Sequence, residues 1–442
     1  MEGLQAAQAL LLAALRNAPR RYRLPPLPAG VEAARAAGVE AALAFAIEAG
    51  RLGQHGGRGA PEAVRDLFTS ALAAFIREAM APQGGDPSFQ ALVLQAGAAE
   101  VREFAQLSAG SAADRRAVRS MTDAIAHPGK TRRLPPGSAR VALERLHALA
   151  DSGAWAELDD ALRAGPHEAI ARGPALQRLL RGEALRQGEA VRRYLALCAQ
   201  RGPGAGSPAA AARGRSAARA GDDAERATVE AFEILVRLLQ ARLPGAYRVL
   251  RSLRPPSGFP GERGKAKDEW DVAIVCEAAA GSADLLLLAE VKASPAAASS
   301  DFARLHRGLQ RLAQAEAGRD YAFAIEGGGT ARLAGASLRA LQPAAGALPE
   351  HVVYCCTAPP EPRPQLLAAA SKAMLAAEPA SLAYAQRLAR GAATDDEELR
   401  PVWDALLHAP RLRATLHQDA TARLVREAML HPADLVASFA GA

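Results

Sequence analysis

The chain has 442 residues, of which 50% are hydrophobic and 23% charged, with a formal net charge of +7 at pH 7. This composition predicts a soluble globular protein of two or three domains with a polyanionic partner, and no apolar run reaches the roughly 18 residues that span a membrane. The four cysteines have neither the spacing of a metal site nor a disulfide framework, which favours a reducing, cytoplasmic setting.

Residues 1–199 are expected to form an all-helical domain, because apolar residues recur there at helical spacing in one segment after another. The clearest such segments are 30–50, 61–80, 138–150 and 183–199, with Pro- and Gly-containing breaks between them. No fixed repeat of roughly 30 to 45 residues is evident, so we expect an irregular helical bundle, with a helical array as the alternative. The start of the chain predicts an amphipathic helix and lacks the basic start of a secretory signal.

Residues 200–221 differ in composition from what precedes them. This segment is rich in Gly, Pro and Ala and contains four arginines and no acid before its end. We expect a flexible basic linker, and the alternative is an arm that contacts phosphates.

A mixed pattern of helices and strands occupies residues 222–359, and residues 360–442 are expected to be a helical C-terminal extension. The predicted elements are a helix over 222–243, strands over 246–251, 270–276 and 285–292, a helix over 299–317, a strand over 321–325, a turn at 327–329, a short helix and a strand over 351–356. This order predicts a mixed sheet flanked by helices, of the α+β or α/β class, between two helical regions.

Charged residues end the most apolar predicted strand, where Glu290 and Lys292 lie two positions apart and therefore on one face of the sheet. Asp271 opens the preceding strand, and a hairpin would bring it alongside Glu290. Two carboxylates are hard oxygen ligands suited to Mg²⁺ or Mn²⁺, and Lys292 is one of only five lysines in a chain that otherwise uses arginine. The constellation predicts a divalent-metal site for phosphodiester hydrolysis, and the alternative is a structural salt bridge.

The element order, with Asp271 in the second strand and Glu290-Val291-Lys292 in the third, resembles the PD-(D/E)xK nuclease superfamily. The resemblance covers residues 222–359 and implies a restriction-endonuclease-like fold. It also implies that Asp271, Glu290 and the carbonyl of Val291 hold the metal, and that Lys292 holds or deprotonates the attacking water. No proline precedes Asp271, where Trp270 stands instead, and members of the family often lack that proline.

The predicted helix over 222–243 offers Glu225, Glu230 and Glu233. The resemblance implies that one helix glutamate assists the metal, and Glu230 matches the family spacing best, so Glu230 joins the predicted catalytic set. An ordinary acid on the helix surface is the alternative.

Basic residues surround the predicted strands on both sides. Lys265 and Lys267 lie in a glycine-containing loop that leads to Asp271, and Arg304, Arg307 and Gln310 lie on the helix that follows Lys292. We expect these five residues to contact nucleic-acid phosphates. A simple flexible loop and a solvated basic helix face are the alternatives.

These expectations describe a Mg²⁺- or Mn²⁺-dependent nuclease that acts on DNA and uses its helical regions for substrate or partner binding, without a membrane partner. An RNA-directed nuclease of the same fold is one alternative. A non-catalytic adaptor, with helical arms around an inert nuclease-like domain, is the other. A role in bacterial defence fits a helical sensor joined to a nuclease by analogy alone.

Overall fold

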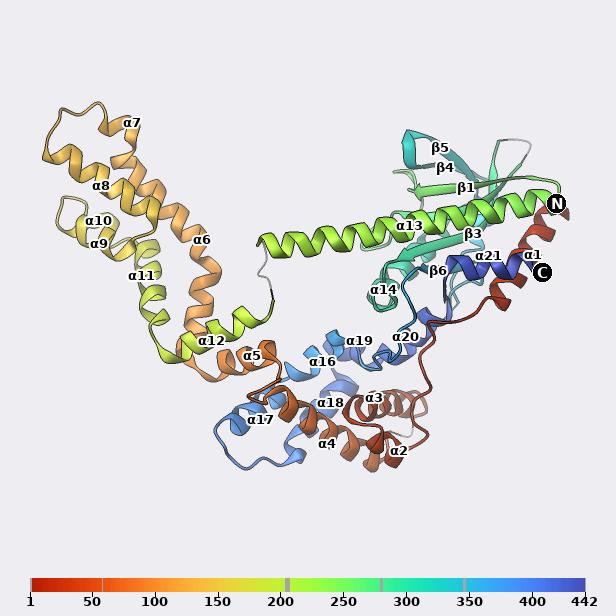
Figure 1. The fold of residues 1–442 in the computed structure, drawn as a ribbon, viewed down its shortest axis with the longest axis horizontal. Helices are drawn as coiled ribbons and strands as arrows, with labels where there is room; N and C mark the ends of the chain where they lie inside the picture. Colours follow the sequence, from red (N-terminus) through yellow and green to blue (C-terminus); the bar gives the residue numbers. More distant parts are fainter. Residues whose placement is uncertain (1, 58, 203–206, 279–280, 345–346, 442) are drawn as a thin grey trace. The chain divides into compact units, whose positions relative to one another are not determined.

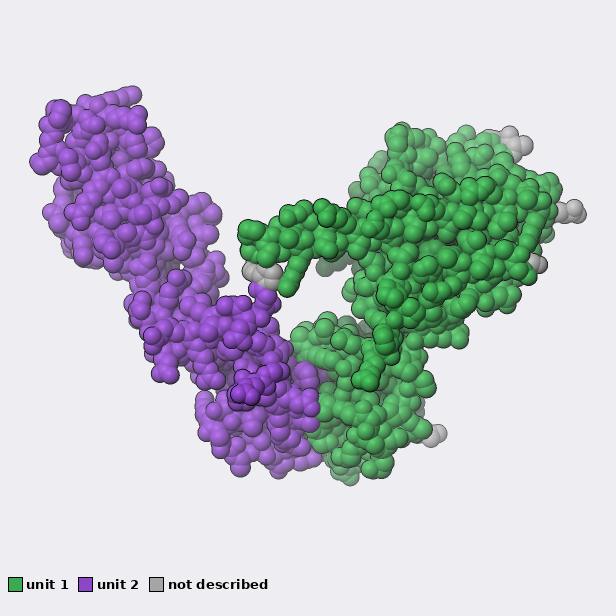
Figure 2. Space-filling model, viewed as in Figure 1, with its two compact units in different colours: residues 1–72, 205–374, 403–442 green, residues 73–204, 375–402 purple. Residues whose placement is uncertain are grey.

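The computed structural model describes residues 2–57, 59–202, 207–278, 281–344 and 347–441, and the chain forms two compact units (Figure 2). Unit 1 comprises residues 1–72, 205–374 and 403–442, and unit 2 comprises residues 73–204 and 375–402. The protein is of the mixed α/β class, with helices before and after a single region of strands in unit 1.

The sheet of unit 1 is drawn in Figure 1. It contains seven strands among the residues that the structure describes. They are β1 (Ala246–Leu253), β2 (Trp270–Glu277), β3 (Ala283–Lys292), β4 (Asp320–Ala324), β5 (Thr330–Ala334), β6 (Val352–Cys356) and β7 (Met429–Leu430). The order is β1-β2-β3-β5-β4, and β6 lies between β3 and β7. β3 therefore has different parallel neighbours along its length, with β5 beside its start and β6 beside its charged end.

Helices cover both faces of this sheet and create two apolar cores. On one face α13 (Pro208–Arg242), α1 (Glu2–Asn17) and α21 (Pro432–Ala440) bury their apolar stripes against the strands. On the other face α14 (Pro295–Leu312), α15 (Gly335–Arg339) and α20 (Gln418–Glu427) contribute to the core. The middle of β3 is buried from both sides, which explains why its sequence is an almost unbroken run of leucine.

The remaining helices are divided between the two units. In unit 1 these are α2 (Val31–Ala36), α3 (Val39–His55) and α19 (Arg413–Leu416). The unit boundaries fall within α4 (Glu62–Ala79), α16 (Ala369–Ala376) and α18 (Arg400–His408). Unit 2 contains α5 (Pro87–Gly97), α6 (Ala99–Ala126), α7 (Pro128–Thr131), α8 (Ser138–Ser152), α9 (Trp155–Arg163), α10 (Glu168–Ala171), α11 (Pro174–Arg186), α12 (Glu189–Gln200) and α17 (Pro379–Ala389). Of the helices described, none is both long and apolar enough to cross a membrane.

The boundaries differ from the expected ones at both ends of the chain. Residues 1–72 do not belong with the rest of the predicted 1–199 domain, because Leu11 and Leu15 of α1 pack into the core against the sheet. The expected C-terminal extension 360–442 is also divided, since 375–402 joins unit 2 and Met429 and Leu430 add strand β7. Contacts between distant chain segments decide this grouping, and local periodicity does not report them.

The expected linker over 200–221 is wrong for its second half, because α13 begins at Pro208. The hydroxyl of Ser207 accepts a 3.1 Å hydrogen bond from the N–H of Ala210, and proline occupies the first turn, so the start of the helix is well capped. Arg213, Arg215 and Arg219 consequently lie on an exposed helix that extends from the body of unit 1 (Figure 2). After residues 327–329, where a turn was predicted, the chain forms β5 before the short helix α15, and only the helix was predicted from the sequence.

Candidate active site

The ends of β2 and β3 bring the two predicted carboxylates together. The strands pair antiparallel with Val272 opposite Ala289, and this register places Asp271 beside Glu290, as the predicted hairpin requires. Oδ2 of Asp271 accepts a 2.7 Å hydrogen bond from the backbone N–H of Val291. Asp271 is therefore tied to the strand that carries the glutamate.

Lys292 contacts Glu290 from the next position on the same face of β3. Its Nζ lies 2.8 Å from Oε1 of Glu290 and 3.1 Å from Oδ2 of Asp301, a residue of α14. The side chain of Glu290 is 2% exposed, whereas those of Lys292 and Asp271 are 18% and 22% exposed. Glu290 thus forms the floor of the site, and Asp271 and Lys292 reach solvent.

A second lysine, Lys267, lies inside this group. Its Nζ is 2.7 Å from Oε1 and 2.6 Å from Oε2 of Glu290, and 3.6 Å from Oδ1 of Asp271. Its side chain is only 7% exposed. Lys267 was predicted to contact DNA from a basic loop, and the structure instead places it among the carboxylates.

Helix α14 holds Lys267 in this position. The backbone N–H of Lys267 donates a 3.2 Å hydrogen bond to the carbonyl of Arg304. Gly308, one turn further along α14, approaches so closely that a Cβ there would lie 2.9 Å from Cβ of Lys267 and from Cζ2 of Trp270. Glycine at this position permits the close contact between the helix and the loop.

Burial and the neighbouring charges together determine the pKa values of Glu290 and Lys292. Burial, reinforced by Asp271, raises the pKa of Glu290 to about 7 despite the opposing effect of the two lysines. Burial alone would lower the pKa of Lys292, but Glu290 and Asp301 outweigh it and raise that pKa. The site is therefore a tightly coupled cluster in which each charge depends on its neighbours.

No family model, curated protein or solved structure matches this chain.

The residues present fit a divalent metal that keeps part of its water shell. Within the described part of the chain, no three His, Cys, Asp or Glu side chains form a ready cage, so an ion here would depend on Asp271, Glu290 and water. Mg²⁺ is commonly bound through one or two carboxylates in this way. The buried hydroxyl of Tyr354, whose residue pairs with Glu290 across β3 and β6, has no hydrogen-bond partner among the described residues, which is consistent with a site that admits water or a ligand.

Of Glu225 and Glu230 on α13, Glu225 is the one whose pKa is influenced by the charge of Asp271. Burial and the nearby Asp271 raise the pKa of Glu225, and an arginine of β1, Arg251, lies 3.8 Å from its carboxylate. Glu230 is exposed. The two residues are five positions apart, which turns the side chain about 140° around the helix, so only one of them can face the strand ends. A role for Glu230 in the site stays a prediction from the family spacing, and Glu225 is the glutamate whose charge interacts with Asp271.

The other predicted basic residues gather on a separate surface next to this cluster. Lys265, Arg307 and Gln310 line a cavity of about 680 Å³ between the 261–266 loop and α14. The guanidinium of Arg307 donates a 3.2 Å hydrogen bond to the carbonyl of Lys265, which joins the two elements. Arg304 is exposed on the same helix but does not line the cavity.

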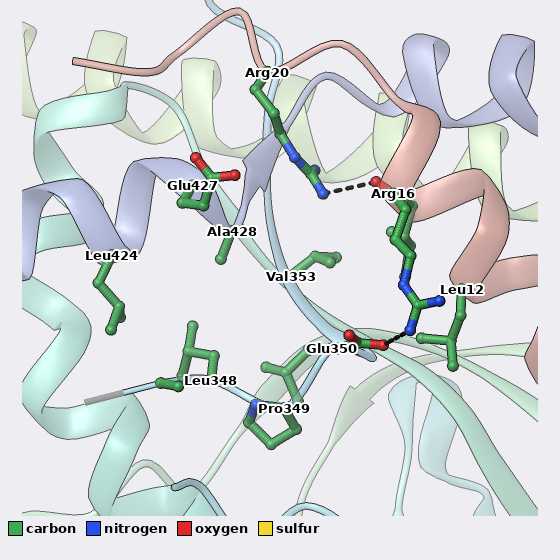
Figure 3. A pocket seen from close by; sticks show the side chains of 13 residues that line it. Leu12, Arg16, Arg20, Leu348, Pro349, Glu350, Val353, Leu424, Glu427 and Ala428 are labelled. Atoms are coloured by element: carbon green, nitrogen blue, oxygen red, sulfur yellow. Dashed lines mark hydrogen bonds and ion pairs between the residues drawn. The ribbon is translucent and has the colours of Figure 1, made fainter. Parts of the chain in front are cut away.

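A different cavity lies near the start of β6, away from the charged end of β3 (Figure 3). Its volume is about 380 Å³, and its walls are mainly leucine, valine and proline side chains with Arg16, Arg20, Glu350 and Glu427. Arg16 pairs with Glu350, and Arg20 donates a 2.7 Å hydrogen bond to the carbonyl of Leu15. None of the residues of the carboxylate–lysine cluster lines this cavity.

Proposed function

We propose that the protein is a metal-dependent nuclease that hydrolyses phosphodiester bonds, with DNA as the expected substrate. The observation that carries this proposal is the convergence of Asp271, Glu290 and Lys292 at the adjoining ends of β2 and β3. A restriction-endonuclease-like arrangement of the sheet is part of the same proposal.

The charge of the cluster supports a role for a cation. The three acids Asp271, Glu290 and Asp301 face the two lysines Lys267 and Lys292, which leaves a formal charge of −1 that repels a phosphodiester. A divalent ion reverses the sign, and when bound it polarises the phosphoryl oxygen and lowers the pKa of its water.

The side chains of this site have distinct roles in the proposed reaction. Asp271 and Glu290 supply oxygen ligands from two adjacent strands, and the N–H of Val291 fixes the orientation of Asp271. Lys292, partly exposed and paired with Glu290 and Asp301, is placed to orient the attacking water and to neutralise charge on the phosphate.

The basic surface beside the cluster supports a polymeric substrate. Lys265, Arg307 and Gln310 line one open cavity, and three exposed arginines lie at the start of α13. Phosphates of an extended strand are contacted by such dispersed cations without regard to base sequence. An RNA substrate would use the same contacts, and RNA is therefore the alternative substrate.

The alternative class of function is a non-catalytic adaptor. The observation in its favour is the deep burial of Glu290 beneath Lys267, which pairs with the carboxylate and donates a hydrogen bond to Oε1 without a metal. In that case the cluster is a structural salt bridge and unit 2 carries the function by binding a protein partner.

Cleavage of plasmid and single-stranded DNA, with and without Mg²⁺ and EDTA, distinguishes these functions. We expect cleavage that requires Mg²⁺ and is abolished by Asp271→Ala and by Lys292→Ala. Matched controls are Glu277→Gln, an exposed carboxylate at the other end of β2, and Lys130→Ala, an exposed lysine of unit 2. Cleavage that survives both site substitutions would place the chemistry elsewhere, and no cleavage by the wild-type protein of DNA or RNA would favour the adaptor.

A further inference from the structure

The ammonium of Lys267 occupies the space between the two carboxylates of the candidate metal site. It contacts both oxygens of Glu290, at 2.7 and 2.6 Å, and lies 3.6 Å from Oδ1 of Asp271. An ion bound by both carboxylates would need oxygens at about 2.0–2.1 Å if it is Mg²⁺. The ammonium and such an ion therefore compete for one place.

We infer that Lys267 is an internal competitor of the metal, so that ion binding requires this lysine to leave Glu290. The inference rests on the proposed function and concerns how its site is controlled. With Lys267 in place, Glu290 is already compensated by two ammonium groups. With Asp301 counted, a divalent ion added to both lysines changes the formal charge of the cluster from −1 to +1. The ion would also have to reach the oxygens of Glu290 that the ammonium of Lys267 already contacts.

The surroundings of Lys267 allow this exchange without rearrangement of the strands. The residue lies outside β2, in the segment that precedes Trp270. Its contacts with α14 are made by its backbone N–H, bonded to the carbonyl of Arg304, and by its Cβ near Gly308, whereas its ammonium contacts the carboxylates. Its neighbours in the chain line the open basic cavity, with Lys265 and Ala266 among the lining residues. A lysine side chain has a flexible four-carbon stem, so its ammonium can exchange partners while the backbone remains in place.

The two lysines of the cluster, Lys267 and Lys292, differ in the groups that they contact. Lys292 binds one oxygen of Glu290 and is additionally held by Asp301 of α14. Lys267 binds both oxygens of Glu290, and its distance to Asp271 is 3.6 Å. Release of Lys267 frees both ligands for the ion and leaves Lys292 in place for catalysis.

The scarcity of lysine permits a direct test on the wild-type protein. Amine-specific labelling followed by mass spectrometry resolves all five lysines of the chain, in the presence of EDTA or of saturating Mg²⁺ or Mn²⁺. We expect Lys267, whose side chain is 7% exposed, to be protected in EDTA and to react several-fold faster when the ion is bound. Exposed Lys130 and Lys265 serve as internal controls whose labelling stays constant.

A second measurement uses the affinity of the full-length protein for Mn²⁺, by calorimetry at pH 8. Lys267→Met keeps the length of the side chain and removes its charge, and we expect Mn²⁺ to bind about ten-fold tighter or more, because a unit charge at contact distance has a large effect in a partly buried site. Lys130→Met, at an exposed lysine of unit 2, is the control and should change the affinity less than about two-fold because solvent screens its charge.

The outcomes separate this inference from the proposed function. If the wild-type protein binds Mn²⁺ while Lys267 remains protected from labelling, the inference is wrong and the nuclease proposal still stands. The inference is also wrong, and the nuclease proposal still stands, if the Lys267→Met variant folds and binds Mn²⁺ no tighter than the wild type. Wild-type and Lys267→Met proteins that both fail to bind Mn²⁺ overturn the metal site itself, and the inference with it.

Discussion

The backbone N–H of Val291 donates a 2.7 Å hydrogen bond to Oδ2 of Asp271, which joins the end of β3 to the end of β2 at the candidate active site. The same carboxylate therefore has a structural and a proposed chemical role. Substitutions that keep the acceptor but remove the charge separate the two roles.

Asp271→Asn and Asp271→Ala are expected to differ in stability but not in activity. Asparagine retains a carbonyl oxygen for the N–H of Val291, whereas alanine leaves that donor without its partner, which costs about 1–3 kcal/mol where the group is buried. Chemical denaturation should therefore find Asp271→Ala the less stable variant, while both lose Mg²⁺-dependent cleavage. Equal stability of the two variants would show that the hydrogen bond contributes nothing to the fold.

Glu225→Gln should weaken Mn²⁺ binding, and Glu230→Gln should not. Glu225 is close enough to Asp271 for the two charges to influence each other, so its loss removes negative charge from the site. Glu230 is exposed on another side of α13 and is the matched control. We expect a several-fold loss of Mn²⁺ affinity for Glu225→Gln and a change below about two-fold for Glu230→Gln, whose exposed charge solvent screens. The opposite order would restore the glutamate chosen from the family spacing.

Gly308→Ala tests the contact between α14 and the loop that carries Lys267. Alanine is the better helix former by about 1 kcal/mol, but its Cβ would lie 2.9 Å from atoms of Lys267 and Trp270. We expect the overpacking to exceed the propensity gain, with a net loss of about 1–2 kcal/mol measured by denaturant unfolding. The control is Gly182→Ala in α11, where a Cβ meets open space and where we expect a gain of about 0.5–1 kcal/mol.

The double substitution of Lys265 and Arg307 by glutamine tests the basic cavity. Both side chains line it, and each lost phosphate contact is expected to lower the slope of log affinity against log salt by about 0.9 on duplex DNA. Fluorescence anisotropy with a labelled duplex in EDTA should show weaker binding and a shallower slope. Arg132 and Arg133, two exposed arginines of unit 2, provide the control pair. An unchanged slope in the cavity variant would locate the phosphate contacts elsewhere, for example on the arginines of α13.

The hairpin of β2 and β3 was predictable as an element, because the leucine run of β3 must be buried and Glu290 and Lys292 lie at its end. Its register was not predictable in the same way. The pairing shifts by one residue between Ile274 and Val275, and this irregularity helps to bring Asp271 beside Glu290.

Residues contributed from outside that hairpin were not predictable in the same way. Lys267 looked like an ordinary loop cation, and only the approach of α14 through Gly308 buries it against Glu290. Asp301 gave no signal of its own, and the choice between Glu225 and Glu230 depends on how α13 rotates against the sheet. The scarcity of lysine was the one available signal for Lys267, because this chain uses arginine nearly everywhere else.

Glu40, near the start of α3, contacts residues of unit 1 that are distant in the sequence, and this contact can be tested. Its carboxylate accepts hydrogen bonds from the N–H groups of Leu366 and Leu367, at 2.7 and 3.0 Å, and from Nζ of Lys372 at 2.9 Å. Burial alone would raise the pKa of Glu40, but these donors outweigh it and lower that pKa. The ionised carboxylate thus stabilises the contact between α3 and the segment that leads into α16.

Glu40→Gln should destabilise the protein by about 1 kcal/mol at pH 7, because charge-assisted hydrogen bonds are replaced by weaker ones. A carboxyl whose pKa is lower in the folded than in the unfolded chain stabilises the fold above the unfolded value of about 4.3, and this contribution disappears as the pH falls through the folded value. Urea unfolding of wild-type and variant proteins should therefore differ at pH 7 and converge toward pH 3. Glu32→Gln is the control, since the side chain of Glu32 on α2 is 88% exposed. A difference that stays constant with pH would mean that the charge of Glu40 does not hold α3 to this segment.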